Sequence, residues 1–329
     1  MRTGPTLLIV VASLMVTGIA GAQGAKPKPQ TGAAKPMPGQ GAKIGTPYKL
    51  GPKGKELHFT LERAEFATRF MIDSDTFVAN PDHRLLVITF AVQNPAKTDT
   101  MLNEREFKMT VVSPDDENYV VENAIVQPDR RTAINMALKP AQKVRAIAYV
   151  MIHPQGPVNK LIVERGTGNP VLRYDLHDLV KPLTGPFALD KVGSINPGIG
   201  VMKVPFELGP FDFTVDSMEE VPGWGDFNPG DGKKVVVFHM TLNNVSMLKW
   251  WSTGNYTNKL FDDDGDEIAS GAILKNSSDE NFYTNPEPNN PMKYRVLFYV
   301  PATAKLTKFV LADGPSGRSV VIPLVIPGS

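Results

Sequence analysis

Apolar and polar side chains alternate along two stretches of the chain, Arg84–Asn94 and Lys234–Asn244. In the later stretch one face carries the apolar side chains of Val236, Phe238, Met240 and Leu242. The corresponding set in the earlier stretch is Leu86, Ile88, Phe90 and Val92. A period of two is typical of a strand with one face in a hydrophobic core. At about 1.5–3 kcal/mol for each large apolar side chain, burial of four gives roughly 6–12 kcal/mol. We therefore expect each stretch to be the central strand of a core.

The two stretches indicate an internal repeat. Their apolar positions are separated by a constant 150 residues (236 − 86 = 150 and 242 − 92 = 150), and both stretches end in asparagine, at Asn94 and Asn244. The preceding segments Pro47–Pro52 and Pro205–Pro210 agree at five of six positions when Tyr and Phe count as alike. The repeat predicts two similar domains.

A further pair of stretches, Val144–Val150 and Tyr294–Val300, shows the same separation of 150 residues and aligns Arg145 with Arg295. Short strand candidates punctuated by Gly and Pro occur in both halves, and convincing helical periodicity is missing. The predicted fold class is therefore all-β. With about 125 residues in each unit, the pattern favours two tandem immunoglobulin-like β-sandwich domains over any α/β fold.

Composition sets the expected domain boundaries. We assign the first β-sandwich domain to residues 47–176 and the second to residues 205–329. The segment 177–204 between them is rich in Pro and Gly, which is typical of a connection rather than of a core element. We expect it to be a linker, partly packed through Phe187 and Leu189.

The N-terminal residues have the composition of an export signal. Arg2 supplies a positive start, Leu7–Val16 an apolar run, and Ala20–Ala22 a cleavage site of small residues, so residues 1–22 are expected to be a signal peptide. The alternative, a membrane anchor, is disfavoured because a bilayer span needs about 20 apolar residues. Residues 23–46, mostly Gly, Ala, Pro, Lys and Gln, are expected to be a disordered tether.

Composition and charge exclude several classes of function. The chain has 35 basic and 34 acidic residues, a formal charge of +1, so no global field indicates nucleic acid or an acidic substrate as partner. It contains no cysteine, which excludes disulfides, thiolate metal sites and a cysteine nucleophile. No later segment is apolar enough to span a membrane after signal cleavage. We therefore expect a secreted or periplasmic protein without a cofactor.

The order of short motifs resembles a known family. Each central strand ends in Asn, an Asp-Gly-x-Glu turn lies at Asp264–Glu267, and a Leu-Lys-Pro step at Leu138–Pro140 precedes a strand that ends in Tyr-Val. This order resembles secreted bacterial immunoglobulin-like domains, a family that includes the mycobacterial immunoprotective extracellular antigen and many exported domains of unknown function. The resemblance implies a β-sandwich and export. It implies no enzyme activity and no catalytic residues.

Two of the three tryptophans, Trp224 and Trp250, are the candidate binding residues. All three tryptophans lie in the second predicted domain. At the separation of 150 residues, Trp224 corresponds to Ser74 and Trp250 to Thr100, whereas Trp251 matches another apolar residue and is expected in the core. A large flat ring that the fold does not require suggests recognition. The alternative for Trp224 and Trp250 is packing at the end of the sandwich or against the first domain.

Acidic residues crowd the segment Asp262–Glu267, and the carboxylates of Asp262, Asp264 and Asp266 could bind calcium. Counted from Asp262, however, the sixth and twelfth positions hold Glu267 and Ile273, where an EF-hand loop has Gly and Glu. A solvated hairpin turn is the favoured interpretation. The five histidines are scattered, and no HExxH or GxSxG motif is present, so no residue is assigned a catalytic role.

These observations predict an exported, non-enzymatic module that binds a protein or glycan of the cell envelope. The second domain is expected to make the specific contacts with this partner. A structural spacer or assembly module of the envelope is the alternative. An envelope hydrolase is the third hypothesis.

Overall fold

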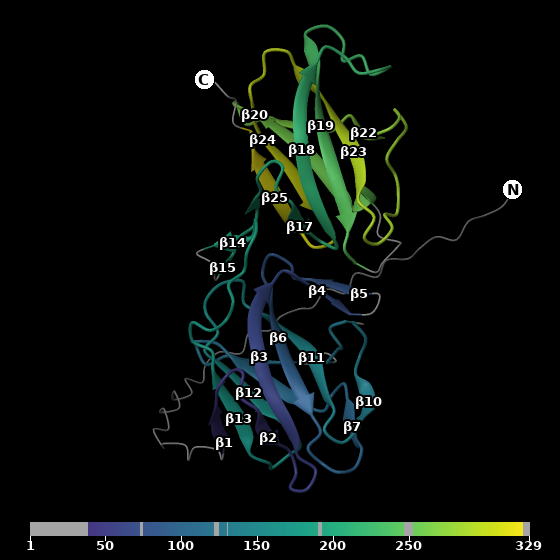
Figure 1. The fold of residues 1–329 in the computed structure, drawn as a ribbon. Coiled ribbons are helices and arrows are strands. Elements are labelled where there is room, and N and C mark those ends of the chain that lie inside the picture. The colour runs from purple at the N-terminus through teal and green to yellow at the C-terminus, as the bar shows by residue number, and fades with distance from the viewer. Residues whose placement is uncertain are drawn as a thin grey trace, which may run out of the picture. The chain divides into compact units, whose positions relative to one another are not determined.

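The computed structural model describes residues 39–72, 75–121, 125–129, 131–189, 193–246 and 253–324. Regular structure in these ranges is almost entirely strand, accompanied by one short 3₁₀ helix, Thr253–Asn255. The strands form several sheets that pack face to face (Figure 1), so the predicted all-β, sandwich-type fold is confirmed.

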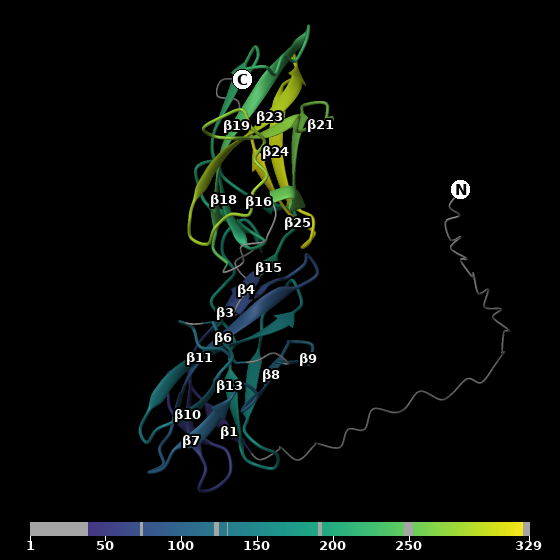
Figure 2. The same cartoon turned by 90° about the vertical axis from the view of Figure 1, so that its right-hand side faces the viewer.

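The first half of the described chain contains two main sheets. One has the order β1 (Gly39–Ala42), β13 (Val171–Asp175), β12 (Lys160–Glu164), β8 (Lys108–Val112) and β9 (Asn118–Val120). The other has the order β11 (Lys143–Ile152), β6 (Arg84–Gln93), β3 (Leu57–Ala67) and β2 (Tyr48–Leu50). Two small ribbons complete this half: β7 (Thr100–Asn103) with β10 (Asn135–Leu138), and β4 (Arg69–Ile72) with β5 (Asp75–Val78). Figure 2 shows β9 beside β8 at the edge of its sheet.

The second half repeats the order of the main strands, with β22 as an additional edge strand. One sheet runs β16 (Gly198–Ile199), β25 (Arg318–Pro323), β24 (Leu306–Asp313), β20 (Tyr256–Asp262) and β21 (Glu267–Ala269). The other runs β17 (Phe206–Leu208), β18 (Phe211–Val221), β19 (Lys233–Asn244), β23 (Met292–Pro301) and β22 (Ala272–Lys275). Between the halves, β14 (Ala188–Leu189) pairs with β15 (Gly193–Ser194). In both halves the first sheet begins with a parallel pair, β1 with β13 and β16 with β25.

The two predicted central strands, β6 and β19, lie in the core, and their predicted inward-facing residues are buried. The opposite face of β6 and part of that of β19 are also covered, which the alternating pattern did not predict. Leu85 and Val87 of β6 pack with Tyr149 in a second apolar cluster. Val235 and Val237 of β19 pack in the same way in a third. The central strand β6 is therefore buried on both faces, whereas β19 is buried on both faces only over residues 235–238.

The asparagine at the end of each central strand closes the turn that follows. Asn94 and Asn244 are both fully buried. Asn94 Nδ2 donates to the carbonyl of Leu138 at 2.8 Å, and Asn244 Nδ2 donates to that of Pro286 at 2.7 Å. Each Oδ1 accepts a backbone N–H two residues further on, at 2.9 Å and 3.0 Å. A buried amide that satisfies the backbone groups around it explains why this residue occurs in both halves.

Strand pairing corrects one part of the sequence alignment. Leu86 lies opposite Val150, and Val236 lies opposite Phe298. If β6 and β19 are aligned at a separation of 150 residues, Val150 of β11 corresponds to Phe298 of β23, a separation of 148 residues (298 − 150 = 148). The alignment of Arg145 with Arg295, which assumed 150, is therefore wrong. A shift of two residues keeps each side chain on its original face, so an alternating pattern cannot detect it.

Two expected boundaries also differ. The tether was expected to reach residue 46, but residues 39–42 form β1, and residues 198–199 of the expected linker form β16. These short strands have no alternating apolar pattern, and each is placed by pairing with a neighbouring strand. Phe187 is buried, as expected for a partly packed linker. The predicted signal peptide, residues 1–22, lies outside the described residues.

One buried arginine connects residues that are far apart in the sequence. Arg318, the first residue of β25, is 1% exposed. Its guanidinium donates to the carbonyls of Ala79, Asn80 and His83 and to the hydroxyl of Ser194. The start of β25 is thereby bonded to the turn that precedes β6.

Candidate functional site

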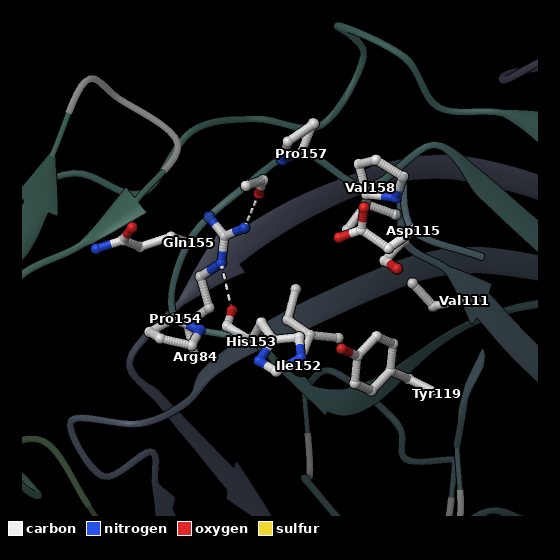
Figure 3. A pocket seen from close by; sticks show the side chains of 13 residues that line it. Arg84, Val111, Asp115, Tyr119, Ile152, His153, Pro154, Gln155, Pro157 and Val158 are labelled. Carbon is white, nitrogen blue, oxygen red and sulfur yellow. Dashed lines mark hydrogen bonds between the residues drawn. The ribbon is translucent and has the colours of Figure 1, made fainter. Parts of the chain in front are cut away.

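A cavity of about 380 Å³ lies in the first half, where β11 ends and the turn of residues 153–158 begins. Its volume falls within the usual range of small-molecule sites. The walls are largely apolar and are formed by Val111, Pro114, Ile152, Pro154, Pro157 and Val158. Figure 3 shows polar side chains set among them, with Arg84 on one side and Asp115 and Tyr119 on the other.

Arg84, the first residue of β6, is 1% exposed. Its Nε donates to the carbonyl of His153 at 3.0 Å, and its Nη2 donates to the carbonyl of Gly156 (Figure 3). The guanidinium carbon lies 3.7 Å from the centre of the Phe66 ring. Among the described residues, Nη1 is buried without a hydrogen-bond partner and no carboxylate forms an ion pair with Arg84. Burial lowers the pKa of Arg84 to about 10, so the side chain remains charged at neutral pH.

The second half shows that the fold does not require this unpaired charge. Lys234 occupies the position equivalent to Arg84 (234 − 84 = 150), and its Nζ lies 2.7 Å from Glu220 Oε2. Glu220 pairs with Val236 across the sheet, as Phe66 pairs with Leu86. Phe66 therefore occupies the place of the carboxylate. The same strand position holds a paired cation in one half and an unpaired buried cation in the other.

A hydrogen-bonded group lies beside the cavity. Glu117 Oε2 accepts a hydrogen bond from the Tyr119 hydroxyl at 2.6 Å and lies 2.9 Å from His153 Nε2. The Tyr119 and His153 bonds lower the pKa of Glu117. Burial and then the bond to Glu117 raise the pKa of Tyr119 to about 12. At neutral pH the carboxylate of Glu117 is thus ionised and already partnered, whereas the Tyr119 hydroxyl is neutral.

The arrangement is suited to holding an anionic group. Arg84 provides a fixed positive charge in surroundings of low polarity, where an ion pair is stronger than in water. A guanidinium forms charge-assisted hydrogen bonds with carboxylates in its plane. The apolar walls can accept the hydrocarbon part of the same ligand.

Trp224, a predicted binding residue, is half-buried and packs over β19 and β23. Its indole Nε1 donates to Asp279 Oδ1 at 3.1 Å, and the Arg295 guanidinium lies 4.9 Å from its ring centre. These contacts match the packing alternative more closely than an open recognition surface. Trp250 lies outside the described residues, so the pairing of the two rings in one patch stays a prediction.

The acidic turn is a hairpin between β20 and β21. Asp262 Oδ1 accepts the backbone N–H of Asp266 at 2.8 Å, and Gly265 adopts a φ of 87° that favours glycine. Within the described ranges, no group of three or more His, Cys, Asp or Glu side chains is placed to hold a metal ion. Asp262, Asp264 and Asp266 are therefore not grouped as calcium ligands in this arrangement.

Sequence reasoning missed Arg84, Tyr119 and His153. The signal that indicates Arg84 is the comparison of the two halves at the start of the central strands, where Arg84 corresponds to Lys234. Lys234 carries the same positive charge as Arg84 and pairs with Glu220. In the first half Phe66 occupies the place of that acid and lies against Arg84. The turn that completes the cavity carries no motif of its own.

No family model matches the sequence, and no curated protein matches it. Among solved structures, an uncharacterised β-sandwich protein from Clostridium difficile 630 is 12% identical, with 44% of this chain and 97% of that chain aligned and a TM-score of 0.33. The yjhA protein from Bacillus subtilis is 13% identical, with 40% of this chain and 99% of that chain aligned and a TM-score of 0.27. In the described ranges we find no helix with the length and apolar character of a membrane span.

Proposed function

We propose that this chain is an exported, non-enzymatic binding protein that takes a carboxylate group of its ligand into the cavity beside Arg84. The observation that carries the proposal is the buried guanidinium whose Nη1 has no hydrogen-bond partner among the described residues. A buried donor without a partner costs about 1–3 kcal/mol, and a ligand oxygen that accepts its hydrogen bond would recover this energy.

Binding requires the turn over Arg84 to move, because the side chain is 1% exposed. The carbonyls of His153 and Gly156, which accept from Arg84, belong to this turn. His153, Gln155 and Pro157 are themselves exposed, whereas Val158 at the end of the turn is buried in the core. A displacement confined to residues 153–157 therefore uncovers little apolar surface. A segment with few buried contacts opens at low cost in free energy. A ligand carboxylate can then replace the Gly156 carbonyl and reach Nη1.

The expected partner is a protein or glycan of the cell envelope, since acidic side chains, chain ends and uronic acids all carry carboxylates. Export is supported by the composition of residues 1–22. The shared order of the main strands in the two halves supports a tandem pair of immunoglobulin-like domains, related to the exported bacterial family that the motifs resemble. In this proposal the first half binds the ligand, whereas the tryptophans had suggested the second.

A structural spacer is the second candidate function. It is favoured by Arg318, whose hydrogen bonds to the carbonyls of Asn80 and His83 join the two halves of the described chain. A spacer needs such a joint and needs no cavity. The two functions are therefore distinguished by ligand binding.

Calorimetric titration with hexanoate and with hexanamide, its uncharged analogue of similar shape, tests the proposal. We expect hexanoate to bind at least about tenfold more tightly, because charge-assisted hydrogen bonds are about twice as strong as neutral ones. In Arg84→Met this preference should disappear, and in the matched control Lys234→Met it should remain. Equal binding of the two compounds by the native protein would contradict the proposal even if Arg84→Met failed to fold.

A further inference from the structure

We infer that the ligand of the Arg84 cavity is a zwitterion, with a carboxylate that pairs with Arg84 and an ammonium group that pairs with Asp115. This inference rests on the proposed function and specifies its ligand. It follows from the second charge that lines the cavity, on the side opposite Arg84 (Figure 3).

Asp115 is the acid that remains available to a ligand. Glu117, two residues further on, is already bonded to Tyr119 and His153. Asp115 is exposed, lines the cavity and forms no ion pair among the described residues. The cavity therefore contains one unpaired positive and one unpaired negative side chain.

The turn that carries Asp115 is held in place by local hydrogen bonds. The backbone N–H of Ser113 donates to the carbonyl of Glu117 at 3.0 Å, and that of Asp116 donates to the carbonyl of Ser113 at 3.2 Å. The Ser113 hydroxyl accepts the N–H of Glu117 at 3.2 Å. These bonds fix the backbone on both sides of Asp115, so its carboxylate is presented at the cavity without a cost of ordering the loop on binding.

Arg84 and Asp115 form no ion pair with each other, and apolar residues such as Val111 and Ile152 line the same cavity. A ligand with a single charge would satisfy one of the two side chains. A ligand with an ammonium group and a carboxylate on one apolar skeleton would satisfy both and fill the space between them. Amino acids, ω-amino acids and short peptides have this chemistry.

Three compounds with the same chain length test the inference: 6-aminohexanoate, hexanoate and hexylamine, titrated by calorimetry into the full chain. Shorter and longer ω-amino acids, from 4-aminobutanoate to 8-aminooctanoate, locate the spacing that fits. At the best spacing we expect the zwitterion to bind at least about threefold more tightly than the carboxylate of equal length, as for an exposed ion pair. The amine should bind more weakly than either.

Asp115→Asn should remove the advantage of the zwitterion, whereas hexanoate should bind this variant at least as tightly as it binds the native protein, because a like charge has been removed from the cavity. Asp116→Asn is the matched control, because Asp116 is exposed in the same turn, does not line the cavity and has a φ of 59°, which asparagine tolerates. An ammonium group that adds no affinity at any chain length, or an advantage that survives in Asp115→Asn, would overturn the inference and leave the proposed function standing. Failure of every carboxylate to bind would overturn both.

Discussion

Buried polar residues divide into two kinds in this protein. Asn94 and Asn244 satisfy the backbone groups around them, whereas Arg84 and Asp313 each retain a buried atom without a partner among the described residues. The first kind stabilises turns that the fold needs in both halves. The second kind costs stability, because burying a polar group without a hydrogen bond is unfavourable. For Arg84 we propose that this loss of stability is retained because the unpaired donor binds a ligand.

Replacing Asn94 with Ala should destabilise the protein by about 3 kcal/mol, because the Leu138 carbonyl and the N–H of Ala96 lose their buried partner. Urea unfolding measures the change. The control is Asn290→Ala, an exposed asparagine, which should alter stability by less than about 0.5 kcal/mol. A similar loss in both variants would show that the buried amide has no special role.

Asp313 should make the protein less stable as the pH rises. Burial raises the pKa of Asp313 in the folded state above its unfolded value, so the folded protein binds this proton more tightly. This contribution is favourable at acidic pH and is lost as the pH increases through the raised pKa. Asp313→Asn should therefore increase stability at pH 7 and have little effect near pH 3, as measured by unfolding at both values. A loss of stability at pH 7 would contradict this account.

At the scale of the element, the sequence predicted the strands whose pattern is local. The alternation in Arg84–Asn94 and Lys234–Asn244 located both central strands, because side-chain period follows directly from backbone geometry. The edge strands β1 and β16 were missed, since their short segments contain no pattern. The cavity was also missed, because it forms only when the turn after β11 folds back over Arg84, which is a tertiary event.

Two truncations test the role of β1. Removal of residues 1–38 should leave stability nearly unchanged, because β1 begins at Gly39. Removal of residues 1–46 deletes β1 and exposes the edge of β13, with which it pairs. An uncovered edge presents unpaired backbone groups and promotes association. We therefore expect the second truncation to melt at a lower temperature and to aggregate more readily. Equal melting temperatures would show that residues 39–42 act as a tether.

At the scale of the whole molecule, the two halves share the order of the main strands and the same position for a buried asparagine, and they differ in what surrounds the start of the central strand. In the second half Lys234 is paired with an acid, and in the first half Arg84 lies against Phe66 and a cavity. Equivalent folds with different local chemistry are consistent with a scaffold that keeps its core and varies its site.

Arg318 should couple the unfolding of the two halves. Its guanidinium bonds to three carbonyls of residues 79–83, and hydrogen bonds from charged groups contribute about 1.5–3 kcal/mol. In calorimetry we expect one transition for the native protein and two resolved transitions for Arg318→Leu. Arg105→Leu, at a side chain that is 82% exposed, should behave like the native protein. An unchanged single transition in Arg318→Leu would show that the coupling lies elsewhere.

We claim that Arg84 receives a ligand carboxylate, and the nitrogen signals of arginine side chains in solution NMR report on this guanidinium. Arg318 is an internal reference, because it is equally buried but donates to four partners. During titration with hexanoate, the Nη signals of Arg84 should shift and saturate along a single binding curve, while those of Arg318 stay in place. If hexanoate binds and the Arg84 signals do not move, or if saturating hexanoate leaves every arginine signal unchanged, the claim is contradicted.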